Sequence, residues 1–416
     1  MKIIFSLMFM FGLLFANDAT IEVIKKVDSL PSLGVEDSSQ EYDETFKMTF
    51  FKSLVADLNV LSIFNVDRFH RVVDYDASTV VVENKDRNYV LRYKMLKMDS
   101  NALSVKMKLI SNNEELFSKS YKVSRTNIYM FVTHAMAYDI NEYMGEPSVA
   151  WMKRKVIFSR VVGAKKSEIV ISDYSLVYQH TIVKGGFNLF PKWANEAQTG
   201  FYYSSLDGKS PTLKYVNLKT LKVSKIISSD GMMVCSDVSS DGNTLLLTMA
   251  KNGQPDIYTY KVDTKRYKRE TRYGGIDVNA QFMGERKIIF ISGRLGYPNV
   301  FSKDLDTKEV EQMVYYGKSN SACSSNGEYI VYKARETSNA FERNTFNLHL
   351  ISMKTDFIRR LTVTGNNEFP RFSKDGDAIL FIKNYKNQSS IGIIRLNHNK
   401  NYLFPLKYGK VQSMDW

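Results

Sequence analysis

The stretch VSSDGNTLLLTMAKNGQPDIYTYKVDT, from Val238 to Thr264, contains two apolar strand-like runs and two tight-turn signals. Asp241-Gly242 precedes the run TLLLTM, and Asn252-Gly253 separates that run from DIYTYKV. Asn, Asp and Gly tolerate the positive φ angles that tight turns between strands require. The stretch therefore predicts adjacent antiparallel strands of one sheet, with the Asp-Gly pair as the turn that enters the first of them.

Copies of this pattern recur through the C-terminal two thirds of the chain. Successive copies begin about 41 to 49 residues apart, close to the ~40 to 45 residues of a four-stranded propeller blade. One such sheet cannot bury both of its faces, whereas a ring of sheets buries them against each other. We therefore predict an all-β six-bladed propeller over residues 147–416. The units begin at Trp151 and Trp193, in fainter form, and at Val238, Phe282, Cys323 and Phe372.

Two segments before residue 146 have the periodicity of amphipathic helices. From Phe46 to Leu58 every fourth residue is large and apolar, and Asp37 to Ser39 supply candidate N-terminal caps. The second apolar face runs from Ile128 to Tyr143 and stops at Gly145, a residue type that often follows a helix end. Both segments therefore predict helices that pack one face against a core.

Strand-like runs lie between these two helices, at Val80 to Val82 and at Tyr89 to Tyr93. From Leu103 to Leu109 apolar and polar residues alternate, Asn112 and Asn113 provide a turn, and the pattern resumes toward Val123. This alternation predicts a hairpin with one buried and one solvated face. Helices and strands together predict a compact α/β domain over residues 39–146.

The first residues, MKIIFSLMFMFGLLFA, have the composition of a secretory signal peptide, residues 1–16. One lysine precedes an apolar run from Ile3 to Phe15, which is shorter than the ~20 residues that span a bilayer as a helix. We expect cleavage after Ala16 and export of a mature protein with no membrane segment. A retained N-terminal anchor is the alternative.

The net charge of +13 does not by itself indicate a nucleic-acid partner, because the basic residues are scattered along the chain. No zinc-finger, RNP or helix-turn-helix pattern accompanies them, so we expect no nucleic acid to be bound. The two cysteines, Cys235 and Cys323, fall at different offsets in non-adjacent repeats. We expect both to be buried and unpaired.

No motif in the sequence predicts catalysis or metal binding. Asp237, Ser239 and Asp241 followed by Gly242 resemble the start of a calcium loop, but its twelfth position holds Thr248 instead of a bidentate Glu. The histidines lie in different elements, and no G-x-S-x-G motif is present. We therefore expect a binding protein that uses no metal and no cofactor.

Several motifs resemble those of the TolB family, the periplasmic components of the Tol-Pal envelope system of Gram-negative bacteria. IEVIKKVDSLPSLGVED, from Ile21 to Asp37, is similar to the family's N-terminal strand and the V-D-S and P-x-G-V elements that follow it. ISDY, from Ile171 to Tyr174, matches the start of the first-blade motif S-D-Y-D-G. FPKW and FPRFSKDG, from Phe190 and from Phe369, resemble the blade openings P-x-W-S-P-D-G.

The resemblance implies a monomeric, non-enzymatic periplasmic adaptor that supports outer-membrane integrity and constriction at cell division. The N-terminal segment, residues 17–38, would bind the inner-membrane protein TolA, and the propeller would bind the lipoprotein Pal, with outer-membrane proteins as further candidate partners. The residues implied for TolA are Thr20, Ile21, Glu22, Val23 and Ile24. Those implied for Pal lie in the loops that enter the blades: Asn188, Phe190, Asp237, Asp277, Asn279, Asn320, Asn367 and Glu368.

The residues leave alternatives open. Residues 20–27 alternate as a strand donated to a partner does, but an ordinary first strand of the α/β domain has the same pattern. The residues implied for Pal also have a plain explanation as turn formers. A periplasmic propeller enzyme acting on polysaccharide is the main functional alternative, and clustered basic or acidic side chains at one mouth would favour it. A propeller that binds peptidoglycan itself is another.

Overall fold

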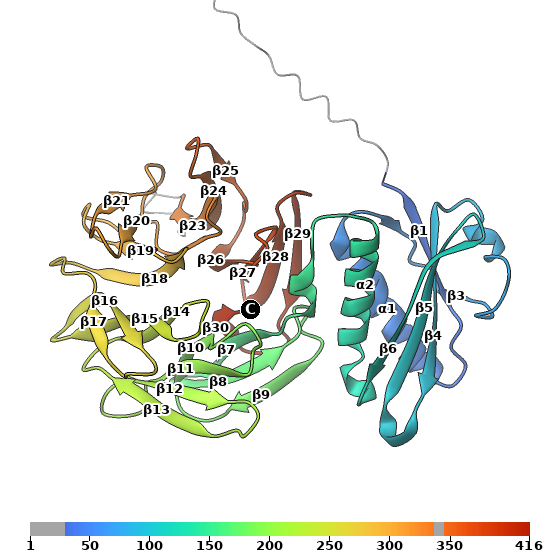
Figure 1. Cartoon of the computed structure of the whole chain (residues 1–416), viewed down its shortest axis with the longest axis horizontal. Coiled ribbons are helices and arrows are strands. Elements are labelled where there is room, and N and C mark those ends of the chain that lie inside the picture. Colours follow the sequence, from blue (N-terminus) through green and yellow to red (C-terminus); the bar gives the residue numbers. More distant parts are fainter. Residues whose placement is uncertain (1–29, 337–344) are drawn as a thin grey trace, which may run out of the picture.

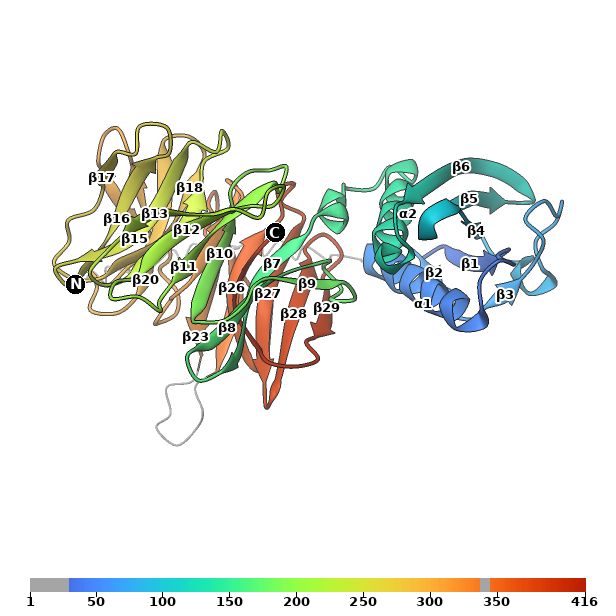
Figure 2. The ribbon, with the colours of Figure 1, turned by 90° about the horizontal axis from the view of Figure 1, so that it is seen from below.

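The computed structural model describes residues 30–336 and 345–416, which form two lobes (Figure 1). The first lobe combines two helices with a mixed sheet, and the second is built from strands arranged in a ring (Figure 1, Figure 2). This confirms the predicted fold class, an α/β domain followed by a six-bladed propeller. Along the described ranges, no helix has both the length and the apolar character needed to cross a membrane.

A six-stranded sheet forms the N-terminal lobe. β1 pairs in parallel with β2, β3 and β4, and antiparallel pairing continues from β4 to β5 and β6. β1 is therefore an inner strand of this sheet, although the sequence grouped residues 32–37 with the N-terminal segment 17–38. The strands are β1 (Ser32–Asp37), β2 (Asn65–Val66), β3 (Arg71–Val72), β4 (Tyr89–Lys97), β5 (Leu103–Ser111) and β6 (Glu114–Val123).

The two predicted helices are confirmed as α1 (Glu44–Leu61) and α2 (Met130–Tyr143), which lie between the sheet and the propeller (Figure 1). The Asp43 carboxylate accepts a hydrogen bond from the Phe46 amide at 2.9 Å and caps α1. The predicted caps at Asp37 to Ser39 are wrong, because β1 continues to Asp37 and the Ser38 amide donates to the carbonyl of Tyr93.

The predicted hairpin is confirmed, with Asn112 and Asn113 at positive φ in the turn between β5 and β6. The strand predicted at Val80 to Val82 is wrong. The amide of Val81 donates to the carboxylate of Glu36 at 2.9 Å rather than to a neighbouring strand, so a buried acid directs this loop. The short 3-10 turns are η1 (Val82–Asn84), η2 (Asp99–Asn101), η3 (Thr126–Ile128) and η4 (Ala150–Lys153).

Six four-stranded blades make up the propeller, and a single parallel pairing, Phe346 with Asn366, links the last two. Blade 1 is β30 (Lys410–Asp415), β7 (Val156–Gly163), β8 (Lys166–Ser172) and β9 (Gln179–Val183). Blade 2 is β10 (Asn188–Trp193), β11 (Gly200–Ser205), β12 (Thr212–Asn217) and β13 (Val223–Ser228). Blade 3 is β14 (Met233–Val238), β15 (Thr244–Lys251), β16 (Gln254–Lys261) and β17 (Tyr267–Arg269). Blade 4 is β18 (Asp277–Met283), β19 (Lys287–Ser292), β20 (Asn299–Asp304) and β21 (Val310–Gln312). Blade 5 is β22 (Cys323–Ser325), β23 (Tyr329–Arg335), β24 (Phe346–Ser352) and β25 (Ile358–Arg360). Blade 6 is β26 (Asn366–Phe372), β27 (Ala378–Tyr385), β28 (Gln388–Arg395) and β29 (Lys400–Pro405).

The ring closes through the C-terminus, which lies in the middle of the blades in Figure 1. β30 pairs antiparallel with β7 and supplies the innermost strand of blade 1. The repeat unit that begins at Trp151 contains only the three outer strands of its blade. Repeat alignment therefore finds the six units but cannot find the strand that completes the first one.

Residues 239–243 form the turn between β14 and β15, as predicted, and Thr244 to Leu247 begin β15. Gly242 has a φ of +74°, and the amide of Thr244 donates to the hydroxyl of Ser239 at 2.8 Å. The hydroxyl of Ser239 and the carboxylate of Asp241 are thus occupied by bonds within the turn. Cys235 and Cys323 are both free and buried, which confirms that prediction.

Candidate functional site

Six side chains, one from the inner strand of each blade, line a cavity of about 370 Å³ at the propeller axis. Five of the six inner strands, all but β22, carry a register shift that ends at this position or two residues before it. Such bulges bend a strand and redirect its side chains. We call these six residues the axial ring: Lys192, Asp237, Gln281, Ser324, Arg371 and Asp415.

Three members of the axial ring also join neighbouring blades. Asp415 accepts the amide of Trp193 at 3.0 Å, and Asp237 accepts the amide of Phe282 at 2.9 Å. The hydroxyl of Ser324 accepts a third amide, from Phe372, at 3.2 Å. These bonds tie blade 1 to 2, 3 to 4 and 5 to 6, so the ring has a structural role in addition to lining the cavity.

The ammonium of Lys192 lies between two carboxylates, at 2.9 Å from Asp237 and 3.0 Å from Asp415. Burial alone would lower the pKa of Lys192, but the two carboxylates raise it above its ordinary value. Lys192 therefore stays charged. Because each carboxylate is held by Lys192 and by a backbone amide, neither is placed as a free acid or base, and the charged ring does not favour a polysaccharide-cleaving enzyme.

Arg371 differs from Lys192 although it occupies the equivalent position. Lys192 follows Phe190-Pro191, and Arg371 follows Phe369-Pro370. The Nε of Arg371 is buried and has no hydrogen-bond partner in the part of the chain that the structure describes. Arg371 lines both the axial cavity and a second cavity of about 90 Å³, so its guanidinium lies between the two spaces.

Four of the residues implied for Pal binding are buried turn formers. Asn188, Asp277, Asn320 and Asn367 are at most 3% exposed. The amide groups of Asn188 and Asn367 each donate to a carbonyl three residues earlier, of Gly185 and Thr364, and Asp277 pairs with Arg294. These side chains are oriented into the turns rather than toward a partner.

The other four divide between the mouth of the propeller and its axis. Phe190, Asn279 and Glu368 are partly exposed where the inner strands begin, and Asp237 belongs to the axial ring. Phe190 and Asn279 have positive φ, at +54° and +57°, as does Phe369, at +49°. The rings of Phe190 and Phe369 lie 6.3 Å apart between centroids. We call Phe190, Asn279, Glu368 and Phe369 the mouth cluster.

Sequence reasoning missed Phe369, Lys192 and Arg371. The signal that could have found them is the F-P-[KR] tripeptide, which occurs at Phe190 and again at Phe369. Taken as a blade opening alone, it predicts no role for the basic residue. The residues implied for TolA binding, Thr20 to Ile24, lie outside the described residues. Within residues 30–336 and 345–416, no three His, Cys, Asp or Glu side chains are grouped as a metal ion would require.

A buried polar network joins the two lobes, and the sequence did not predict it. His134 of α2 is 1% exposed and lies 2.8 Å from Asp57 of α1 and 3.2 Å from Asp173 of the loop after β8. The hydroxyl of Tyr174 donates to Asp57. Burial alone would lower the pKa of His134, but the two carboxylates raise it to about 9. The ISDY motif thus supplies two residues of a contact between the lobes.

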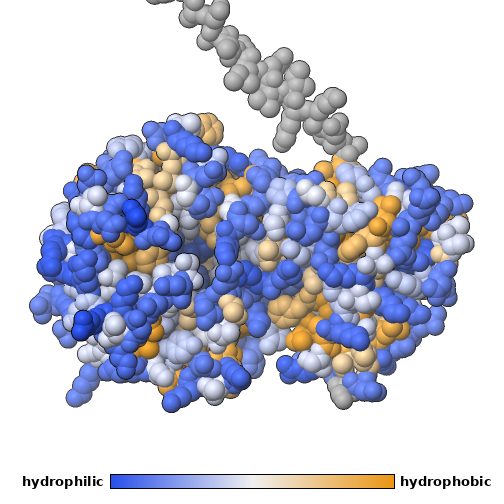
Figure 3. Space-filling view, viewed as in Figure 1, coloured by the Kyte–Doolittle hydropathy of each residue, from blue (hydrophilic) through white to orange (hydrophobic). Residues whose placement is uncertain are grey.

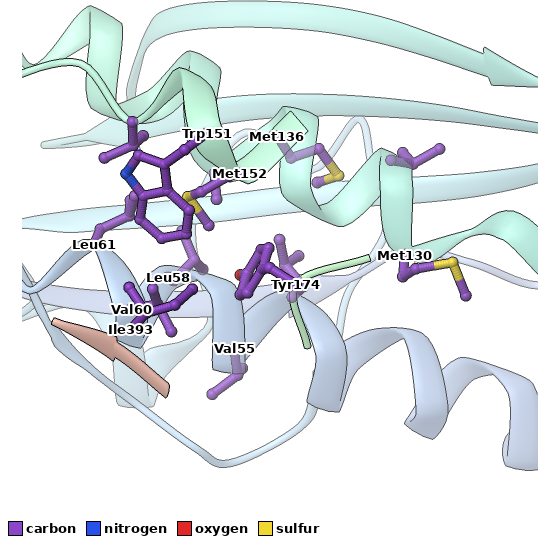
Figure 4. Packing of buried hydrophobic residues seen from close by; sticks show 14 of the residues in the cluster. Val55, Leu58, Val60, Leu61, Met130, Met136, Trp151, Met152, Tyr174 and Ile393 are labelled. Atoms are coloured by element: carbon purple, nitrogen blue, oxygen red, sulfur yellow. The ribbon is translucent and has the colours of Figure 1, made fainter. Parts of the chain in front are cut away.

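Apolar packing continues across the same interface. Trp151 and Tyr174 pack beside Leu58 and Leu61 of α1 in one core shared by both lobes (Figure 4). Arg395 of β28, which is fully buried, donates to the carbonyl of Leu61 at 3.0 Å and to Asp377 at 2.8 Å. By contrast, the outer face in Figure 3 is largely hydrophilic. The lobes are therefore packed as one body.

Comparison with known proteins gives one consistent family. Residues 147–416 match the family model described as the TolB beta propeller domain. The Tol-Pal system protein TolB of Wolinella succinogenes is 49% identical over 97% of both chains, and that of Campylobacter jejuni is 42% identical over 100% of both. A crystal structure of TolB from Acinetobacter baumannii, 19% identical, superimposes with a TM-score of 0.74 and covers 92% of this chain and 97% of that one; at this identity it supports the fold alone.

Proposed function

The chain belongs to the TolB family of Tol-Pal system proteins, which are not enzymes, and on that premise we propose that it is a periplasmic adaptor between Pal and TolA. Pal would bind the propeller, and TolA would bind the N-terminal segment. The observation that carries the proposal is the mouth cluster beside the axial ring. Partly exposed aromatic side chains next to desolvated polar groups are typical of the energetic centre of a protein interface.

The position of β1 supports a role for the N-terminal segment. The chain enters this inner strand at Ser32, and the carboxylate of Glu36 is bound by Arg92 at 2.9 Å. A partner bound to residues 20–27 would therefore be attached to a strand that is fixed within the sheet. The proposed TolA site therefore continues along the chain into β1, and β1 is held in the lobe by its pairing with β2, β3 and β4.

The shared core and the polar network support coupling between the two sites. We infer that TolA engagement changes the affinity for Pal and so controls when Pal reaches peptidoglycan during outer-membrane constriction. A coupling of about 1.4 kcal/mol would change Pal affinity tenfold. The periplasm, where Pal and the periplasmic domain of TolA are both accessible, is the compartment in which this function is expected.

Pal capture tests the propeller assignment. Mature protein immobilised by an N-terminal tag is expected to retain Pal from envelope extracts in mild detergent, because this attachment leaves the C-terminal strand at the propeller axis undisturbed. The measurement is the amount of Pal on the resin. The Phe190→Ser variant, which removes one aromatic ring of the mouth cluster, is expected to retain less. If the folded wild-type protein retains no Pal, the proposal is wrong.

Deletion of residues 20–27 tests the TolA assignment. We expect the shortened protein to lose TolA binding while its affinity for Pal stays the same or rises. The reason is that the deletion ends before β1 and leaves the sheet and the propeller complete. Both affinities can be measured by titration calorimetry, with circular dichroism as the check of folding. Retained TolA binding would contradict the assignment, and loss of both affinities with a changed spectrum would indicate misfolding.

A further inference from the structure

We propose that Arg371 is the recognition site for a carboxylate side chain of the protein that binds at the propeller mouth. This inference rests on the proposed function, because it assigns the chemistry by which the partner is recognised. Among the charged residues of the axial ring, Arg371 is the one without a hydrogen-bond or ion-pair partner within the described residues.

The two F-P-[KR] tripeptides place a cation at the same position in two blades, but only one cation is paired. Lys192 has Asp415 in the preceding inner strand and Asp237 in the following one, and it contacts both. Arg371 has Ser324 before it and the same Asp415 after it. Lys192 therefore has a carboxylate on each side, whereas Arg371 has a hydroxyl on one side and, on the other, a carboxylate that already pairs with Lys192.

The acceptors near Arg371 are already occupied. The hydroxyl of Ser324 accepts the amide of Phe372 at 3.2 Å. Asp415 accepts the Lys192 ammonium with one oxygen and the Trp193 amide with the other. At the mouth, the carboxylate of Glu368 pairs with Lys333 at 2.7 Å. Each of these acceptors is bonded to another donor, and none of them is bonded to Arg371.

A partly buried guanidinium without an acceptor is costly, and a carboxylate is the group that relieves the cost most effectively. Its two oxygens match the planar fork of Arg and form two charge-assisted hydrogen bonds. The bonds would form in a space that the bound partner covers, where such bonds are stronger than at an open surface. Arg371 is thus preorganised for an anion that arrives from outside.

The surroundings favour an acid on a protein over a free anion. The cavity of about 90 Å³ at the mouth is lined by Phe369 and Pro370 beside Arg371, and by the Lys333–Glu368 ion pair, whose charges already offset each other. Phe369 and Phe190 are partly exposed beside it. A small hydrated ion would leave these two aromatic rings in water, whereas a partner surface would cover them and insert one acidic side chain.

The test measures the affinity of the mature protein for the soluble domain of Pal by titration calorimetry. Replacing Arg371 by methionine is expected to weaken binding by about 30-fold or more, as the loss of one member of a desolvated charge pair does. Arg371→Lys is expected to lose less, because the charge remains but the two-pronged geometry does not. Lys354→Met is the matched control, since Lys354 is exposed, pairs with Glu328 and lines neither cavity that Arg371 lines; its effect should be below about threefold.

The outcomes separate the two levels of the proposal. If wild-type protein does not bind Pal, the proposed function fails. If wild-type protein binds Pal and Arg371→Met, with an unchanged thermal melt, binds equally well, only the role of Arg371 is overturned. A site for a free ion would instead show millimolar phosphate or acetate binding to wild type but not to Arg371→Met, with Pal affinity unchanged, and that result also overturns the inference.

Single Asp→Asn and Glu→Gln variants of Pal then identify the acid. One of them should weaken binding to wild type by about the same factor as Arg371→Met and have almost no further effect on Arg371→Met, as a double-mutant cycle requires. If every acidic variant of Pal has the same effect on both forms, Arg371 has no specific carboxylate partner and the inference is wrong.

Discussion

Replacing Arg92 by methionine is expected to lower the free energy of unfolding of the N-terminal lobe by about 3 to 5 kcal/mol, the usual cost of removing one member of a buried ion pair. Arg92 and Glu36 are both fully buried, and Nε of Arg92 lies 2.9 Å from the Glu36 carboxylate. The guanidinium also donates to the carbonyls of Ala77 and Thr79, at 2.7 and 2.8 Å. The variant would leave a buried charge and these carbonyls without a donor.

Denaturant unfolding measures this effect, and Arg87→Met is the matched control. Arg87 pairs with Asp67 at 2.8 Å, but its side chain is 30% exposed and Asp67 keeps a second partner, Arg71. The control should lose less than about 1 kcal/mol. The double variant Glu36→Gln with Arg92→Met should recover part of the loss, since no unpaired charge remains. Equal losses for Arg92→Met and Arg87→Met would show that the buried pair has no special role.

Replacing His134 by glutamine is expected to destabilise the contact between the lobes by about 3 kcal/mol at neutral pH or below, given a pKa near 9 in the folded state and an ordinary value near 6.5. The variant leaves Asp57 and Asp173 buried together without a cation. Asp57 faces His134 from α1, and Asp173 and Tyr174 face it from the loop after β8. Tyr129, just before α2, interacts electrostatically with both carboxylates.

The pH dependence distinguishes this charge effect from a loss of packing. Because folding raises the pKa of His134, its protonated form stabilises the folded protein. The contribution is fully present below about pH 6.5 and is lost as the pH rises through about 9. The difference in unfolding free energy between wild type and His134→Gln should therefore shrink toward zero by about pH 10. His180→Gln, at an exposed position in β9, is the control, and a difference that does not change with pH would contradict the ionic role.

The count of blades could be predicted because each blade carries its own turn chemistry. Gly242 and its counterparts Gly327 and Gly376 adopt positive φ in equivalent turns, so a local requirement repeats with the structural unit. The same property limits what the sequence can say of the partner surface, which stays a prediction. Asn188, Asn320 and Asn367 recur at blade entries because they form turns, and recurrence could not distinguish a turn former from a contact residue.

By itself, the sequence determined the two domains, the six repeats, the two helices and the hairpin, because hydrophobic period and turn residues act over a few neighbouring positions. Only the tertiary structure decided which residues meet across long separations. It placed β30 beside β7, His134 between Asp57 and Asp173, and both carboxylates of the axial ring at Lys192 rather than at Arg371. Such pairings depend on how distant strands and helices pack, and a local pattern does not specify that packing.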